Sequence, residues 1–88
     1  MIRRRYVIRG RVQGVGFRYY VLRCVHGWPV CGHVRNQMDG SVLIEAEGDA
    51  AAVDSFMTEV MREPPGRVDS RAVTEIPATG GTGFRIRY

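Results

Sequence analysis

The chain has 88 residues, of which 13 are basic, all of them arginine, and nine are acidic, so its net charge is +4. A chain of this length has room for one core, and we expect residues 1–88 to form a single domain. No apolar run approaches the roughly 18 residues that a membrane span needs. The early arginines Arg3, Arg4 and Arg5 are not followed by the apolar segment of an export signal. We therefore expect a cytoplasmic protein without membrane contact, and the basic balance favours anionic partners.

Two cysteines, Cys24 and Cys31, lack the Cys-x-x-Cys spacing of zinc and redox sites and have no cluster of histidines around them. They could form a disulfide, but in a reducing cytoplasm two free thiols are the favoured interpretation. We expect no metal site.

Residues 5–12 alternate between apolar and basic side chains, which is typical of a strand with one covered face. Tyr6, Ile8 and Val12 share the covered face. Arg5, Arg9 and Arg11 share the other face, which we expect to be wet and basic.

A glycine-containing loop follows, and then an apolar stripe with steps of three and four residues. The stripe predicts a helix of about three turns. Its members are Phe17, Tyr20, Val21, Cys24 and Trp28. Gly27 and Pro29 are expected to end this helix.

Two further strands are predicted over residues 30–36 and 41–47, joined by a turn that contains Asp39 and Gly40. His33 falls on the outward face of the first of these strands, where we expect a solvated surface residue. Glu45 and Glu47 fall on the outward face of the second.

A second helix is predicted after Asp49, a plausible N-cap, and is expected to end at the Pro64-Pro65 pair. Its buried stripe consists of Val53, Phe56, Met57, Val60 and Met61. A strand within residues 68–76 and a short last strand with Phe84, Ile86 and Tyr88 complete the chain. The order β-α-β-β-α-β with a short C-terminal strand predicts an α+β fold, a ferredoxin-like sandwich with two helices on one face of a mostly antiparallel sheet.

Residues 10–18 connect the first strand to the first helix through two glycines: Gly10-Arg11-Val12-Gln13-Gly14-Val15-Gly16-Phe17-Arg18. Glycines let backbone N–H groups turn inward, and a helix start adds unpaired N–H groups and the positive end of the helix dipole. A phosphate would bind there, with Arg18 as a bidentate partner. Gly-rich turns also occur as plain connections, and that alternative is open on the loop alone. The loop contains no Asp, Glu, His, Cys, Ser or Thr, which favours a reaction that needs neither a nucleophile nor a general base from it.

These residues resemble the acylphosphatase family. The loop of residues 10–18 fits the family's phosphate loop, and a second block fits as well: Gly32-His33-Val34-Arg35-Asn36, followed by Asp39-Gly40-Ser41-Val42 and later Gly48. The resemblance implies an enzyme that hydrolyses the carboxyl–phosphate bond of acyl phosphates to a carboxylate and inorganic phosphate, without metal or organic cofactor.

The resemblance also implies the roles of individual residues. The phosphate would be held by Gln13, Gly14, Val15, Gly16, Phe17 and Arg18. Arg18 and Asn36 would be the catalytic residues, with Asn36 positioning the attacking water. His33 stands where the family usually has an aromatic residue.

Several alternatives stay open at this point. Arg18 could be a solvated helix arginine, and Asn36 could be a turn former. The chain could be a catalytically silent acylphosphatase-like domain that binds phosphate. It could also be an RNA-binding module of the same fold, with outward arginines tracking a backbone, although its aromatics fall on the core faces. We expect a monomer with small-molecule partners, acyl phosphate and inorganic phosphate, and no nucleic acid.

Overall fold

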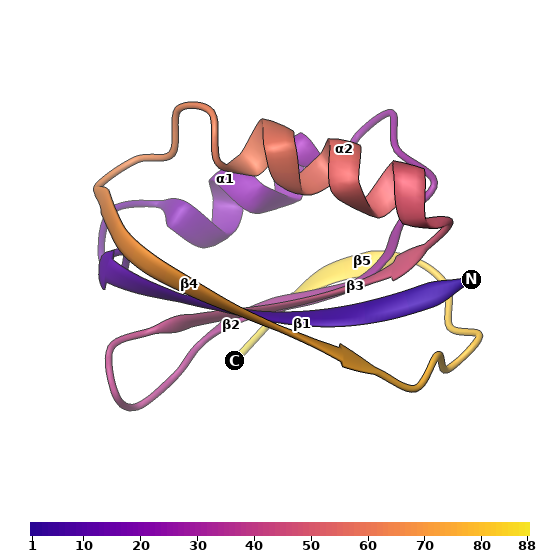
Figure 1. Cartoon of the computed structure of the whole chain (residues 1–88). Helices are drawn as coiled ribbons and strands as arrows, with labels where there is room; N and C mark the ends of the chain where they lie inside the picture. The colour runs from indigo at the N-terminus through magenta and orange to yellow at the C-terminus, as the bar shows by residue number, and fades with distance from the viewer.

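The computed structural model describes all 88 residues. Its elements are β1 (Ile2–Arg11), α1 (Phe17–Cys24), β2 (Cys31–Asn36), β3 (Val42–Gly48), α2 (Ala50–Val60), β4 (Arg67–Ile76) and β5 (Phe84–Arg87). The predicted element order is therefore confirmed, and both helices cover the same face of one sheet (Figure 1). Neither helix has the length and apolarity that a bilayer crossing requires.

The sheet has the strand order β4-β1-β3-β2-β5. β3 pairs antiparallel with both β1 and β2, and β5 pairs parallel with β2. The three strands β1, β2 and β5 consequently run in one direction, and β1 and β2 end at the same edge of the sheet, on the left of Figure 1. The loop after β1 and the turn after β2 meet at that edge.

The core lies between the sheet and the two helices. Alternate residues of β1, including Tyr6 and Ile8, are buried there, and Phe17 of α1 and Phe56 of α2 are fully buried against them. Removing each such side chain from water contributes roughly 1.5–3 kcal/mol before the entropy of ordering the chain is counted. Phe84 of the last strand joins the core edge-on to Phe56, with ring centroids 5.6 Å apart.

Both helices end earlier than the sequence predicts. The first helix has eight residues instead of about three turns, because helical hydrogen bonding stops near Val25 and the Trp28 N–H donates to the Val25 carbonyl in a turn. Gly27 has a φ of 89°, in the left-handed region, and Pro29 disfavours helical backbone at Trp28, so the helix cannot continue to Trp28. Trp28 still packs against the core. The second helix begins after Asp49 as predicted, although the Asp49 side chain makes no capping hydrogen bond, and it ends at Val60, before the Pro64-Pro65 pair that was expected to end it.

The face of the sheet away from the helices, called here the open face, is less exposed to solvent than the sequence predicts. Arg3, His33 and Glu47 all lie on this face, yet they are only 7%, 9% and 3% exposed. The prediction that His33 is a solvated surface residue is therefore wrong. Long arginine side chains and the loop between β4 and β5 cover the middle of the sheet there.

Glu47 anchors that loop. Its carboxylate accepts the N–H groups of Thr79 (2.7 Å) and Gly80 (2.8 Å), and it pairs with the Arg3 guanidinium at 3.1 Å. These donors, the Thr79 N–H foremost, lower the pKa of Glu47 to about 2. The carboxylate is therefore ionised at neutral pH and stabilises the folded chain.

We predict that Glu47→Gln lowers the free energy of unfolding at neutral pH and flattens its acid dependence. The pKa of Glu47 lies below its ordinary value of 4.5. Its stabilising contribution is therefore complete above about pH 4.5 and is lost as the pH falls toward 2. Urea unfolding at a series of pH values measures the effect. The exposed Glu63, changed to Gln, is the control and should leave the curve unchanged. A Glu47→Gln curve parallel to the wild-type curve below pH 4.5 would contradict the assignment.

Candidate active site

The loop between β1 and α1 turns through two glycines in the left-handed region, Gly14 with φ 73° and Gly16 with φ 84°. An L-residue in this region costs about 1 kcal/mol or more, which glycine avoids. Immediately after Gly16 the chain enters α1 with Phe17, whose ring is buried in the core. The loop is thus tight, and one of its ends is fixed by apolar packing.

The backbone N–H groups of residues 13–16 donate no hydrogen bond within the protein. The first amide along this path to find an acceptor is that of Tyr20, which bonds the Gly16 carbonyl at 3.0 Å. No acidic side chain lies in the first turn of α1 to satisfy the others. Free hydrogen-bond donors at the start of a helix favour the binding of an anion. The sequence predicts such binding at Gln13, Gly14, Val15, Gly16 and Phe17.

The side chain of Gln13 has a task that the sequence does not reveal. Its Nε2 donates to the carbonyls of Gln37 (2.7 Å) and Ser41 (2.9 Å), which bracket the turn between β2 and β3. The two acceptors lie more than 20 residues away along the chain, so no local pattern indicates them. Gln13 therefore fastens the anion-binding loop to the turn that begins directly after Asn36.

Asp39 holds the same turn from within. It accepts the backbone N–H of Ser41 at 3.0 Å and pairs with Arg9 of β1 at 3.0 Å. Hydrogen bonds from Ser41 and Arg9 lower the pKa of Asp39 to about 2, so it is ionised at neutral pH. The turn is fixed by an aspartate, the residue that forms such turns through its own side chain.

Asn36 is the last residue of β2 and lies opposite Val42 of β3. Its carboxamide makes no hydrogen bond within the protein, although its Oδ1 is buried. Asn36 therefore does none of the bonding expected of a turn former, a task that Asp39 performs. Buried polar atoms are rarely left without a partner, and those that are have a functional explanation or bind a water.

Arg18 lies in the first turn of α1, half-buried and without any carboxylate partner. Its guanidinium stacks over the ring of Tyr88, 4.9 Å from the centroid. Tyr88 follows β5, in which Arg87 is aligned with Arg35 of β2, the neighbour of Asn36. This chain of contacts brings Arg18 to the sheet edge where β2 ends, and it argues against a freely solvated arginine.

The structure thus gathers at one edge the loop amides, Arg18 and Asn36, all expected from the sequence. It contains no group of three or more His, Cys, Asp or Glu side chains that could hold a metal ion. Both cysteines are free thiols and lie outside this region.

The chain matches the family model described as acylphosphatase over residues 4–86, nearly its whole length. It belongs to the acylphosphatase family. The acylphosphatase of Oceanobacillus iheyensis is 43% identical over 84 residues, which cover 92% of each chain. The crystal structure of acylphosphatase from Bacillus subtilis superposes with a TM-score of 0.90 at 40% identity and covers both chains fully. Full-length HypF, solved in a phosphate- and nucleotide-bound form, is also similar (TM-score 0.85, 29% identity), but this chain covers only 12% of it. The fold therefore also occurs as one part of a larger protein.

We predict that Gln13→Ala weakens the binding of inorganic phosphate by up to about 30-fold, because the loop loses two hydrogen bonds between neutral groups that fix its position, each contributing about 1 kcal/mol. Calorimetric titration measures the affinity. Gln13→Glu is the matched variant: it keeps the shape, but a carboxylate cannot donate and would face two carbonyl oxygens. It should lose at least as much. Wild-type affinity in Gln13→Glu would show that the fastening is not needed.

Proposed function

We propose that this protein is an acylphosphatase that hydrolyses the carboxyl–phosphate bond of small acyl phosphates, and that residues 1–88 act as one acylphosphatase-like domain. One observation carries the proposal: hydrogen-bond donors without acceptors and an unpaired buried amide oxygen converge at one edge of the sheet. A phosphate and an attacking water are the two species that such a combination suits.

The phosphate is held by the N–H groups of Gln13, Gly14, Val15, Gly16 and Phe17 and by the guanidinium of Arg18. Backbone donors aimed at one point stabilise negative charge without having to reorganise during the reaction. Arg18 adds a planar pair of donors that matches two phosphate oxygens. Its stacking on Tyr88 limits the directions in which this fork can point.

Asn36 orients the nucleophile. Its Oδ1 accepts a hydrogen bond from a water molecule, whose oxygen then attacks the phosphorus atom. The bond from phosphorus to the acyl oxygen breaks, and its electron pair leaves on the carboxylate. The proton of the water passes to a phosphate oxygen. A carboxylate is a weak base, so its departure needs no general acid, which agrees with a loop that contains none.

Two alternatives from the sequence are weaker. An RNA-binding module of this fold stacks bases on aromatic residues of its open face. Here Tyr6 is buried under the helices and Phe84 packs against Phe56 in the core. Tyr88, predicted on the same face of the last strand, lies outside that strand and is exposed, but it stacks on Arg18. A catalytically silent phosphate-binding domain would keep the loop but would not need an unpaired Asn36.

The decisive experiment follows the loss of acetyl phosphate in metal-free buffer, with and without added inorganic phosphate. Turnover that phosphate inhibits supports the proposal. Phosphate binding without turnover would identify the silent domain instead. Strongly salt-dependent binding of RNA without turnover would identify the third candidate.

We predict that Arg18→Ala and Arg18→Lys each reduce kcat/KM by about 10³-fold, the scale seen when an arginine that stabilises phosphoryl transfer is removed. Lysine keeps the charge but offers no fork, so it should not rescue the activity. Steady-state kinetics of the two variants measure the effect. Arg23→Ala, at an exposed position on the same helix, is the control. Near-normal activity in Arg18→Lys would show that charge alone suffices.

We predict that Asn36→Ala reduces kcat by about 10²-fold, the cost of a misplaced reactant. Inhibition by inorganic phosphate should be unchanged, because the loop and Arg18 are intact. If phosphate inhibition weakens as much as turnover does, Asn36 holds the phosphate and the water-positioning role is wrong.

The remaining expectations stay predictions: a monomer in the cytoplasm that uses no metal or organic cofactor. Two free thiols are typical of a reducing compartment.

A further inference from the structure

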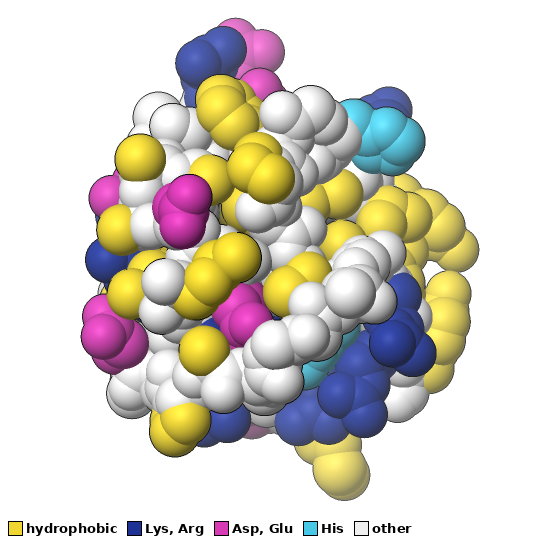
Figure 2. Space-filling model, turned by 90° about the vertical axis from the view of Figure 1, so that its right-hand side faces the viewer, with side chains coloured by type: hydrophobic (Ala, Val, Ile, Leu, Met, Phe, Trp, Pro, Cys, Tyr) yellow, Lys and Arg dark blue, Asp and Glu magenta, His cyan; other side chains and the backbone are white.

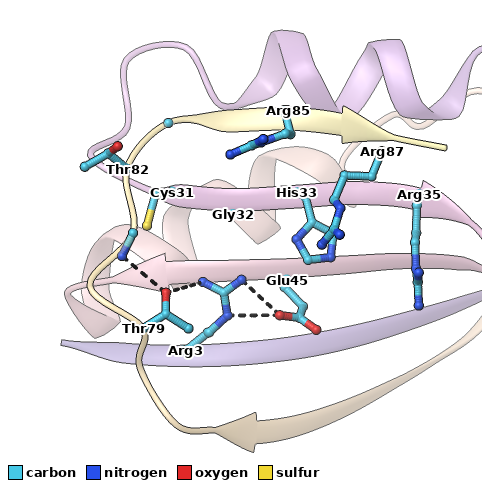
Figure 3. A pocket seen from close by; sticks show the side chains of 12 residues that line it. Arg3, Cys31, Gly32, His33, Arg35, Glu45, Thr79, Thr82, Arg85 and Arg87 are labelled. Atoms are coloured by element: carbon cyan, nitrogen blue, oxygen red, sulfur yellow. Dashed lines mark hydrogen bonds and ion pairs between the residues drawn. The ribbon is translucent and has the colours of Figure 1, made fainter.

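A second concentration of positive charge lies on the open face, on the opposite side of the sheet from α1 and α2. It surrounds a hollow of about 430 Å³ between β2, β5 and the loop that precedes β5. Figure 3 shows Arg87 reaching from β5 across β2 to His33, while Arg85 lies along β5. Arg35 extends from β2 at the right of the same view. Small-molecule sites have volumes of this size.

The charges around the hollow do not balance. Arg3 and Arg5 of β1 pair with two carboxylates, those of Glu45 and Glu47. No carboxylate pairs with the three arginines at positions 35, 85 and 87, which together leave a local charge of +3. We call these three residues the arginine triad. Figure 2 shows basic side chains gathered beside a partly covered histidine on one side of the molecule.

The strand register forces the triad together. β2 and β5 are aligned so that Arg35 lies next to Arg87 and His33 lies next to Arg85. Like charges directly across neighbouring strands destabilise a sheet. Three guanidinium groups on two paired strands therefore raise the free energy of the fold unless an anion binds between them.

His33 lies among these charges and is nearly buried. Burial is the main cause that lowers its pKa; Glu45 raises the pKa, and Arg87, Arg3 and Arg35 lower it.

The hollow offers donors but no surface for stacking. The loop at its rim adds the N–H groups of Thr82 and Gly83, which donate to no acceptor within the protein. Its lining contains no Phe, Tyr or Trp, so a nucleic acid base finds no platform. One phosphate group carries about −1.5 to −2 charges at neutral pH and would not balance three arginines, whereas two linked groups would.

From this combination we propose that the arginine triad binds a compact anion of linked phosphates, of the pyrophosphate class, at a site separate from the loop of residues 13–18. The linked phosphates are free pyrophosphate or the diphosphate of a nucleotide, since both present the same oxygens to guanidinium forks. This site is independent of the proposed hydrolysis: Arg35 and Asn36 are adjacent in β2 and thus point to opposite faces of the sheet.

The test titrates pyrophosphate into the Arg18→Ala protein by calorimetry, so that the loop of residues 13–18 is already weakened. We expect one binding site, and adding Arg85→Ala and Arg87→Ala should weaken it by at least about tenfold, the loss of two charge-assisted contacts. Arg62→Ala with Arg71→Ala removes the same charge from exposed positions outside the hollow and should leave the affinity unchanged. In the wild-type background the Arg85→Ala, Arg87→Ala protein should hydrolyse acyl phosphate normally.

Two further measurements test which group of the ligand is recognised and where it binds. ADP and pyrophosphate of equal affinity identify the diphosphate as the group that is recognised, and adenosine should not bind. By NMR, pyrophosphate should raise the pKa of His33, and the ring resonances of His26, which is exposed and does not line the hollow, should not move when pyrophosphate is added. Absence of pyrophosphate binding in Arg18→Ala, or binding that survives in a folded Arg85→Gln, Arg87→Gln variant, would overturn the proposal.

Discussion

The antiparallel pairing of β3 with both β1 and β2 is the constraint on which the site depends. It makes β1 and β2 parallel to one another with a strand between them, so that both end at the same edge. The loop after β1 and Asn36 at the end of β2 are more than 20 residues apart in sequence, yet this pairing makes them neighbours. Gln13 then closes the remaining gap with two hydrogen bonds to the turn beyond Asn36.

The site consists almost entirely of groups that the fold leaves unsatisfied. Loop amides, the Arg18 guanidinium and the Asn36 oxygen would each stabilise the protein more if they had partners inside it. Neighbouring residues position each of these groups: Phe17 is buried directly after the loop, Tyr88 stacks on Arg18, and Asp39 fixes the turn that follows Asn36. In the site that we propose for this acylphosphatase family member, positioning takes the place of acid or base side chains.

The sequence predicts the element order and the anion loop because both depend on local patterns. Alternation in β1, the apolar stripe of α2 and the two loop glycines are each visible within about ten residues. It predicts that Gly27 and Pro29 stop the first helix, but not that the helix already ends at Cys24, because the apolar stripe continues to Trp28. Nor does it predict the burial of His33 or the fastening by Gln13, since both arise from contacts with distant strands. That the Asn36 oxygen has no hydrogen-bond partner can be known only from the three-dimensional structure, which gives the positions of all possible donors.

The anchoring of the loop before β5 by Glu47 has a consequence for local opening. β5 is the shortest strand, it lies at the edge of the sheet, and it pairs with β2 alone. Strands of this kind open at a lower free energy than the core. Detachment of β5 would move Tyr88 away from Arg18, and it would also separate Arg85 and Arg87 from Arg35. The least protected strand of the sheet is thus in contact with both proposed sites, and Glu47, which holds the loop at the rim of the hollow, limits how often the strand opens.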